Sequence, residues 1–376
     1  MPDLPDTGTF VTRVWRPALG PCLALHRSGV LIDITTRATP TMRDLLERDD
    51  LPQYLATVTG PLIAPLADLD RHEPARDDLH LLSPADLQAI KACGVTFARS
   101  MIERVIEERA AGDPSQAAAI RARVTTVIGG SLRNLKPGSA EAAEVKRLLL
   151  AEGLWSQYLE VGIGPDAEVF TKAPPMASVG YGAAVGLHPI SRWNNPEPEV
   201  VLAVDSRGQI KGAALGNDVN LRDVEGRSAL LLGKAKDNNA AASIGPFIRV
   251  FDDRFGIDHV RSLELTLTVT GLDGFALQGR SSMSEISRDP LDLVAQTLSA
   301  HQYPDGFMLY CGTMFAPVQD RDGPGQGFTH HLGDRVTIAA PALGSLTNTV
   351  RLATEAPPWT FGTMALMRNL AGRGLL

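Results

Sequence analysis

One acidic segment at the head of an apolar run constrains the fold of this chain more than any other feature. Glu197 and Glu199 stand one residue apart, and the apolar residues 200–204 follow them directly. Alternate side chains of an extended strand face the same side, so both carboxylates point to one face. Two like charges side by side repel each other unless a cation lies between them. The segment therefore predicts either an exposed strand start or a cation site.

A predicted hairpin brings a third carboxylate back to this segment. The turn residues 205–208 separate the first apolar run from a second one, which ends at Asp218. Because the return strand of a hairpin lies beside the start of the first strand, we expect Asp218 near Glu197 and Glu199. Three carboxylates with no His or Cys nearby suit a hard divalent ion, most simply Mg²⁺ with water completing the octahedron. The alternative for Asp218 is a turn residue that caps the next segment.

Two further charged residues are candidates for proton transfer. A lysine such as Lys236 that is desolvated near a bound cation has a lowered pKa and can move protons. Glu168 begins an alternating segment in which it shares a face with Phe170 and Lys172. The alternatives are a surface lysine at 236 and a solvated carboxylate on a sheet edge at 168.

Length, charge and cysteine content bound the class of protein. With 376 residues the chain exceeds one ordinary core, and we expect two domains. The net charge of −7, without a basic cluster interleaved with aromatics, favours a small metabolite over nucleic acid as the partner. The three cysteines form no disulfide or zinc pattern, which favours a cytoplasmic protein. We also expect neither an export signal nor a membrane span, since no sufficiently long apolar run occurs.

The pattern of elements predicts an α+β fold with a boundary near residue 155. Short apolar runs in residues 8–34 predict a small antiparallel sheet, and residues 41–152 are expected to be helical. From there to residue 352, β-branched runs predict a β-rich domain with one helix after Asp289. The expected domains are therefore 1–155 and 156–376.

Local signals predict where individual helices begin. Ser83 and Asp113 are each followed by a proline at the first helical position, so both are expected to cap helices. Residues 139–152 make another predicted helix, and residues 363–370 a final one that docks on the protein.

The order and spacing of these motifs resemble the fumarylacetoacetate hydrolase superfamily over residues 94–345. The motifs, in chain order, are Phe170-Thr171-Lys172, Pro196-Glu197-Pro198-Glu199, Asn217-Asp218-Val219, Arg222-Asp223, Lys236, Gly245-Pro246, Pro304-Asp305-Gly306 and Gly312-Thr313. The resemblance implies a β-rich catalytic roll or sandwich, an N-terminal domain with a lid-like segment at 94–112, and assembly as a homodimer or homotetramer.

The resemblance also implies roles for individual residues. Glu197, Glu199 and Asp218 would hold Mg²⁺, for which Mn²⁺ could substitute. Glu168 and Lys236 would be the acid/base pair, with the base left open between them. Thr313 would contact the substrate carboxylate, and Ser100 and Phe97 of the lid-like segment would also bind substrate.

Within the superfamily the chain is most similar to the 2-keto-3-deoxy-pentonate dehydratases. This similarity runs through residues 194–197, 225–228 and 325–330. It implies a small 2-keto-3-deoxy sugar acid as substrate, which loses water to give 2,5-dioxopentanoate. The configuration at C4 of the substrate is not decided by the sequence.

One departure from the hydrolytic relatives bears on the reaction. Their lid segment carries a His and a Glu that activate water, and here Ser100 stands at the histidine position. A serine without a nearby base activates water poorly. Glu103 is retained one helical turn later, so an acylpyruvate-type hydrolase or a 2-oxo acid decarboxylase stays as an alternative, and a non-catalytic sugar-acid-binding protein as a second. No role is predicted for Asn239, His330 or His331.

Overall fold

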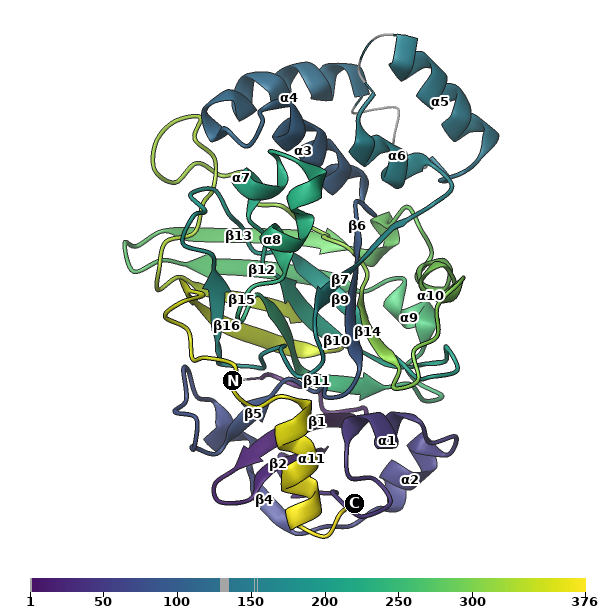
Figure 1. Ribbon diagram of the computed structural model, residues 1–376, viewed down its shortest axis with the longest axis vertical. Helices are drawn as coiled ribbons and strands as arrows, with labels where there is room; N and C mark the ends of the chain where they lie inside the picture. The colour runs from purple at the N-terminus through teal and green to yellow at the C-terminus, as the bar shows by residue number, and fades with distance from the viewer. Residues whose placement is uncertain (1, 129–134, 152, 154) are drawn as a thin grey trace.

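The computed structural model describes residues 2–128, 135–151, 153 and 155–376, and two β-sheets form its body (Figure 1). The strands are β1 Phe10–Arg16, β2 Gly20–Arg27, β3 Val30–Asp33, β4 Leu62–Pro65, β5 His80–Leu82, β6 Ala89–Gly94, β7 Glu168–Ala173, β8 Ala184–Leu187, β9 Pro198–Val204, β10 Ile210–Asp218, β11 Ala242–Val250, β12 Glu264–Thr270, β13 Ala276–Ser282, β14 Phe307–Tyr310, β15 Arg335–Ala340 and β16 Gly344–Leu352. The larger sheet has 11 strands in the order β4-β3-β2-β1-β11-β10-β9-β14-β6-β7, with β5 paired to β1. The smaller sheet has five, in the order β13-β12-β15-β16-β8.

The helices lie at both ends of this body and beside its sheets. Their bounds are α1 Met42–Leu46, α2 Leu51–Thr57, α3 Ala98–Arg109, α4 Pro114–Ile128, α5 Ala140–Ala151, α6 Gln157–Ile163, α7 Arg222–Glu225, α8 Leu232–Lys236, α9 Ile257–Val260, α10 Pro290–Leu298 and α11 Thr363–Gly372. Figure 1 shows α3 to α6 at one end, here called the cap, α1, α2 and α11 at the opposite end, and α8, α9 and α10 beside the sheets. The mixture of sheets and helices confirms the α+β prediction.

The N-terminal strands continue the large sheet and do not form a sheet of their own. β1, β2 and β3 are antiparallel neighbours, as predicted. β1 also pairs with β11, where Val11 lies opposite Ile248, and β6 pairs with β14 in parallel. The sheet thus joins strands from both sides of residue 155. The division into domains 1–155 and 156–376 stays a prediction. The two parts contribute strands to the same sheet.

Some of the predicted helices form and others do not. The cap at Asp113 is confirmed, because α4 begins at Pro114 and the amide of Ser115 donates to the Asp113 carboxylate at 3.0 Å. The helices predicted over 139–152, after Asp289 and over 363–370 are confirmed as α5, α10 and α11 within the described residues. The uniformly helical prediction for 41–152 is wrong, since β4, β5 and β6 lie in that range.

The helix predicted after Ser83 is also wrong, for a reason that lies in the tertiary structure. Asp86 does not support a local helix start, because its carboxylate accepts the amides of Met42 and Arg43 at 2.6 and 3.1 Å. It thereby satisfies free N–H groups at the first turn of α1, which lies far away in the sequence.

Apolar packing is divided between the body and the cap. The two largest groups of buried apolar side chains both include residues of β9 and β10, and β10 also contacts β15 of the smaller sheet. The cap has its own apolar group, which includes Met101 and Val105 of α3 and Leu159 of α6. The open end of the β9–β10 hairpin therefore lies between two separately packed units.

Candidate metal and active site

The β9–β10 hairpin brings the three predicted carboxylates together. Its register places Glu199 opposite Gly216 and Pro198 opposite Asn217, so the strand start and strand end meet. One oxygen each of Glu197, Glu199 and Asp218 lies within 4.8 Å of the others. The three residues are only 2%, 0% and 1% exposed, so the reading as a solvated strand start is wrong.

Backbone and amide groups hold these carboxylates in place. The amide of Glu197 donates to Oδ1 of Asn217 at 3.1 Å, and the amide of Asp218 donates to the Glu197 carbonyl at 3.0 Å. Glu199 accepts the amide of Gly312 at 2.6 Å and the hydroxyl of Thr313 at 3.3 Å. Gly312 has a φ of +105°, and a β-carbon there would collide with Thr96, so only glycine brings this amide to Glu199.

Two buried lysines form ion pairs with two of these carboxylates. Lys236 on α8 donates to Glu197 at 2.5 Å and to Asp218 at 3.1 Å. Lys172 on β7 is 0% exposed and lies 2.7 Å from the other oxygen of Asp218. Burial alone would raise the pKa of Asp218, but these two ammonium groups hold it below its usual value.

The pKa of Lys236 shifts in the direction opposite to the expectation. Burial by itself would lower this pKa, but Asp218 and Glu197 together raise it above its ordinary value. The predicted lowering of the Lys236 pKa is therefore wrong. The prediction assumed a cation near Lys236, whereas two carboxylates contact it directly. Lys236 therefore carries a positive charge in this arrangement.

Glu168 lies at the start of β7 with an unusually free carboxylate. Its backbone pairs with Gly94, whose missing side chain leaves room for the Glu168 carboxylate. Among the described residues, no side chain or amide forms a hydrogen bond or ion pair with this carboxylate. Burial raises its pKa, although Arg104 and Lys236 act in the opposite direction. The side chain is thus available to exchange a proton.

The donor set fits a divalent metal ion. All three converging ligands are carboxylate oxygens, which hard cations prefer. Glu199 meets only neutral donors, and among the described residues no cation pairs with it. Burial and the two neighbouring carboxylates raise the pKa of Glu199 well above its usual value, so this corner of the cluster lacks positive charge. A divalent ion would supply it.

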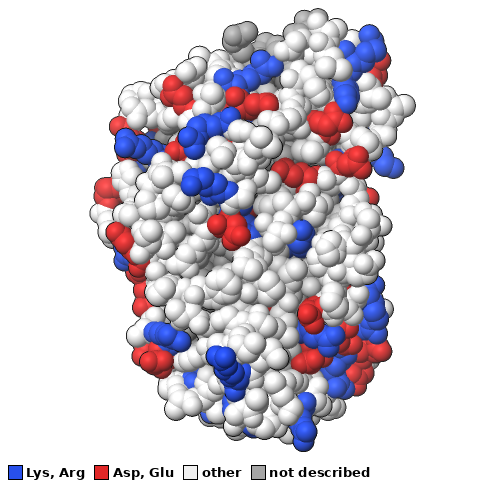
Figure 2. Space-filling model, viewed as in Figure 1, with Lys and Arg blue, Asp and Glu red and all other residues white. Residues whose placement is uncertain are grey.

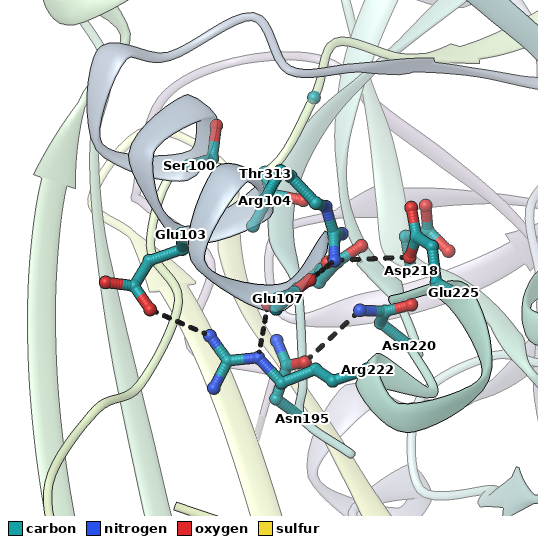
Figure 3. Close-up of polar contacts among 12 residues, drawn as sticks. Ser100, Glu103, Arg104, Glu107, Asn195, Asp218, Asn220, Arg222, Glu225 and Thr313 are labelled. Atoms are coloured by element: carbon teal, nitrogen blue, oxygen red, sulfur yellow. Dashed lines mark hydrogen bonds and ion pairs between the residues drawn. The ribbon is translucent and has the colours of Figure 1, made fainter. Parts of the chain in front are cut away.

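The lid-like segment presents its residues differently from the expectation. Ser100 donates to the carbonyl of Phe97 at 2.9 Å, and Phe97 is 1% exposed within the main apolar core. Glu103 is held by Arg121 through two bonds of 2.9 and 2.7 Å. In Figure 3 Ser100 and Glu103 lie on α3 away from Asp218, whereas Arg104 of the same helix reaches toward it. Substrate contacts by Ser100 and Phe97 remain predictions.

The network of ion pairs around Arg104 was missed by the sequence analysis. Arg104 pairs with Glu197, Glu107 and Glu225, and Glu107 also accepts Arg222 at 2.7 Å. Burial raises the pKa of Glu225 to about 7, against the opposing effect of Arg104. The one signal in the sequence was the place of Arg104, one helical turn after Ser100 in the lid-like segment. Nothing in the neighbouring sequence shows that its side chain reaches Glu197, just before β9. Asn239 and His330, which had no predicted role, bond to Ala353 and to Asp334.

The charged side chains on the outer surface are arranged differently from those of the buried site. Figure 2 shows Lys/Arg and Asp/Glu side chains of both signs intermixed across one face. No helix in the described ranges is both long and apolar enough to cross a membrane.

Comparisons with known proteins support the resemblance. Residues 165–351 match the family described as fumarylacetoacetate (FAA) hydrolase C-terminal. The chain is 31% identical over 193 residues to a Haloferax volcanii protein named "Probable 2-keto-3-deoxyxylonate dehydratase", covering 51% of this chain and 63% of that protein. It is 30% identical over 154 residues to the 2-dehydro-3-deoxy-D-arabinonate dehydratase of Saccharolobus solfataricus, covering 41% and 51% of the two chains. The matches thus span between half and two thirds of the length of these relatives.

A solved structure shares the fold over most of the chain. It is titled "2-keto-3-deoxy-D-arabinonate dehydratase complexed with magnesium and 2,5-dioxopentanoate" and is 20% identical. The superposition has a TM-score of 0.64 and covers 91% of this chain and 99% of the other. Residues 165–351 therefore carry a domain of the fumarylacetoacetate hydrolase family, and the fold shared with the solved structure extends beyond that domain.

Proposed function

We propose that this protein is a Mg²⁺-dependent dehydratase that converts a 2-keto-3-deoxy-pentonate into 2,5-dioxopentanoate and water. The observation that carries the proposal is the group of three buried carboxylates within 4.8 Å, flanked by Lys236. The names of the two curated relatives and the product in the similar solved structure support the choice of reaction.

The two relatives' names point to one kind of substrate. D-Xylonate and D-arabinonate differ only at the carbons that become the keto group and the CH₂ group in the 2-keto-3-deoxy acid. C4 is the remaining stereocentre, so we infer that the substrate is the D-configured acid, as in the Saccharolobus relative.

Glu197, Glu199 and Asp218 would hold the metal ion. A bound Mg²⁺ would act as a Lewis acid that polarises the 2-oxo group and makes the C3 protons more acidic. The hydroxyl of Thr313, which bonds to Glu199, would then lie close enough to contact the substrate carboxylate.

Glu168 and Lys236 would move the protons. Glu168 accepts the C3 proton, since its carboxylate has no partner among the described residues and burial raises its pKa. Lys236 donates a proton to the departing C4 hydroxyl, since its contacts keep it charged. One water leaves and a C3–C4 double bond forms. Loss of a C5 proton and gain of one at C3 then give the C4–C5 enol, which becomes the aldehyde when C4 gains a proton and the C5 hydroxyl loses one.

The lid contacts favour dehydration over hydrolysis. Hydrolysis requires a group that activates water, but the hydroxyl of Ser100 is bonded to Phe97 and the carboxylate of Glu103 to Arg121. Decarboxylation on the same metal site would show a different product.

A substrate panel tests the function. Purified protein is incubated with D- and L-2-keto-3-deoxy-pentonate and with an acylpyruvate, each with Mg²⁺ and with EDTA, and products are identified by NMR. We expect 2,5-dioxopentanoate from the D acid, loss of activity in EDTA and recovery on adding Mg²⁺ or Mn²⁺. Activity indifferent to chelation, or cleavage of the acylpyruvate alone, would contradict the proposal.

Two variants test the proton-transfer roles. Lys236→Ala and Glu168→Gln should each lower kcat by about 10²-fold or more while metal binding is kept. Lys234→Ala, two residues before Lys236 in sequence and without an ion pair among the described residues, is the matched control and should retain activity. Near-normal turnover by Lys236→Ala would remove it from the mechanism.

We also propose that the protein assembles as a homodimer or homotetramer, on the basis of the family resemblance. Light scattering after size-exclusion chromatography measures the mass directly, and a monomer would refute this part.

A further inference from the structure

The side chain of Arg104 joins the cap to the metal-site carboxylates. It extends from α3, is 8% exposed, and pairs with Glu197 through Nη2. Its Nη1 lies 2.6 Å from Glu107 and 3.2 Å from Glu225. Figure 3 shows this guanidinium between the cap helix and the carboxylates. One buried cation thus binds three carboxylates, and only one of them belongs to the candidate metal site.

The three metal-site carboxylates differ in what occupies their oxygens. Both oxygens of Glu197 contact cations, Arg104 on Oε1 and Lys236 on Oε2. Both oxygens of Glu199 contact neutral donors. A divalent ion held by Glu197 would therefore meet a guanidinium on the same carboxylate, and two cations a few ångströms apart in a buried site repel each other strongly.

Arg104 is the cation that can leave Glu197 at the lower cost. Lys236 bonds to two of the three metal-site carboxylates, so moving it would disturb both. Arg104 bonds to one and keeps Glu107 and Glu225 when that contact breaks. Once released, Nη2 is a charged donor beside the metal site, and a guanidinium suits a carboxylate ligand.

We propose that Arg104 competes with the metal ion for Glu197 and, once displaced, binds the carboxylate of the acid substrate. Arg104 therefore couples the cap to the site in two steps, first releasing Glu197 to the ion and then holding the anion that the ion has recruited. The second step rests on the proposed function; the first does not.

Metal binding without substrate tests the first step. Mn²⁺ affinity is measured by titration calorimetry for the wild type, Arg104→Gln and Arg121→Gln. Arg121 belongs to the same network but contacts Glu103 and not Glu197, which makes it the matched control. We expect Arg104→Gln to bind Mn²⁺ about 10-fold more tightly and Arg121→Gln to stay within about 2-fold of the wild type. Unchanged or weaker binding by Arg104→Gln would overturn the competition.

Binding of an unreactive acid tests the second step. Pyruvate is titrated into protein saturated with Mg²⁺, and Arg104→Gln should bind it at least about 10-fold more weakly than Arg121→Gln does. With the substrate, KM should rise more than kcat falls, and Arg104→Lys should recover part of the pyruvate affinity. Equal pyruvate affinity in both Gln variants would overturn this step while leaving the dehydratase proposal intact.

A measurement on the wild type keeps the inference testable if Arg104→Gln does not fold. Hydrogen exchange of α3 amides should become about 2- to 5-fold faster on adding Mg²⁺, because a cap contact is lost, and slow again on adding pyruvate. Protection that only increases with Mg²⁺ would contradict the release of Arg104. If no 2-keto-3-deoxy acid turns over, the dehydratase proposal fails, yet the Mn²⁺ and exchange results still decide the competition.

Discussion

The β9–β10 and β12–β13 hairpins are both antiparallel, but they carry their charges in opposite environments. Every residue of β9 is buried, whereas β12 alternates between exposed and buried residues. Glu264 of β12 pairs across the strands with Arg280 in solvent, while Glu199 of β9 is 0% exposed and lacks a cation among the described residues. An exposed pair contributes at most about 1 kcal/mol, but a buried unpaired carboxylate costs several. A carboxylate kept in such surroundings without a cation partner indicates a cation-binding site.

The largest expected difference between the hairpins is in metal binding. Glu199→Gln removes one charged ligand with little change in shape, so Mn²⁺ affinity and turnover should each fall by about 10³-fold or more. Glu264→Gln should change neither. Calorimetry measures the Mn²⁺ affinity and an activity assay measures turnover. Normal Mn²⁺ affinity in Glu199→Gln would contradict the assignment of metal binding to the β9–β10 hairpin.

A matched pair of leucines compares packing in the two hairpins. Leu202 of β9 is 0% exposed, and Leu272 in the turn of β12–β13 is 86% exposed. Leu202→Ala should lower the free energy of unfolding by about 2 to 5 kcal/mol, since it leaves a cavity. Leu272→Ala should change it by about 0.5 kcal/mol or less. Urea denaturation provides the comparison, and similar losses would show that β9 is less tightly packed than the structure indicates.

The buried carboxylates should also make stability depend on pH. Burial raises the pKa of Glu225, which lies in the ion network over the open end of β9–β10, to about 7. The folded protein therefore binds this proton more tightly than the unfolded chain, and the stability it contributes is present below about pH 4.5 and lost as the pH rises through 7. Glu225→Gln should reduce the loss of stability between pH 5 and 8 in EDTA by roughly 1 to 3 kcal/mol.

The exposed carboxylate at position 264 is the control for this pH effect. Glu264→Gln should leave the pH profile of the urea midpoint unchanged, because that side chain is half exposed to solvent. A Glu225→Gln profile parallel to the wild type would show that Glu225 does not carry the effect.

The smallest effect is expected for the pair on the outer hairpin. A double-mutant cycle on Glu264 and Arg280 should give a coupling of about 0.5 kcal/mol, reduced further in 1 M salt. A coupling above about 1.5 kcal/mol would mean that exposed and buried charges differ less here than their surroundings indicate.

Local sequence patterns correctly predicted those helices and hairpins that are determined by residues close to one another in the sequence. The β9–β10 hairpin and the starts of α4 and α10 are where they were expected, because turn and capping residues act within a few positions. The helix after Ser83 failed, since Asp86 caps α1 instead. The burial of the carboxylates was open from the sequence alone, because it depends on the cap and the second sheet.

The sequence by itself determined that Glu197, Glu199 and Asp218 meet, because strand alternation and a short turn bring them to one end of a hairpin. Only the tertiary structure decided what surrounds them. The contact from Arg104 to Glu197 spans 93 residues and that from Gly312 to Glu199 spans 113. Such contacts form when separate packed units dock, and the charges that decide the chemistry of the site come from both.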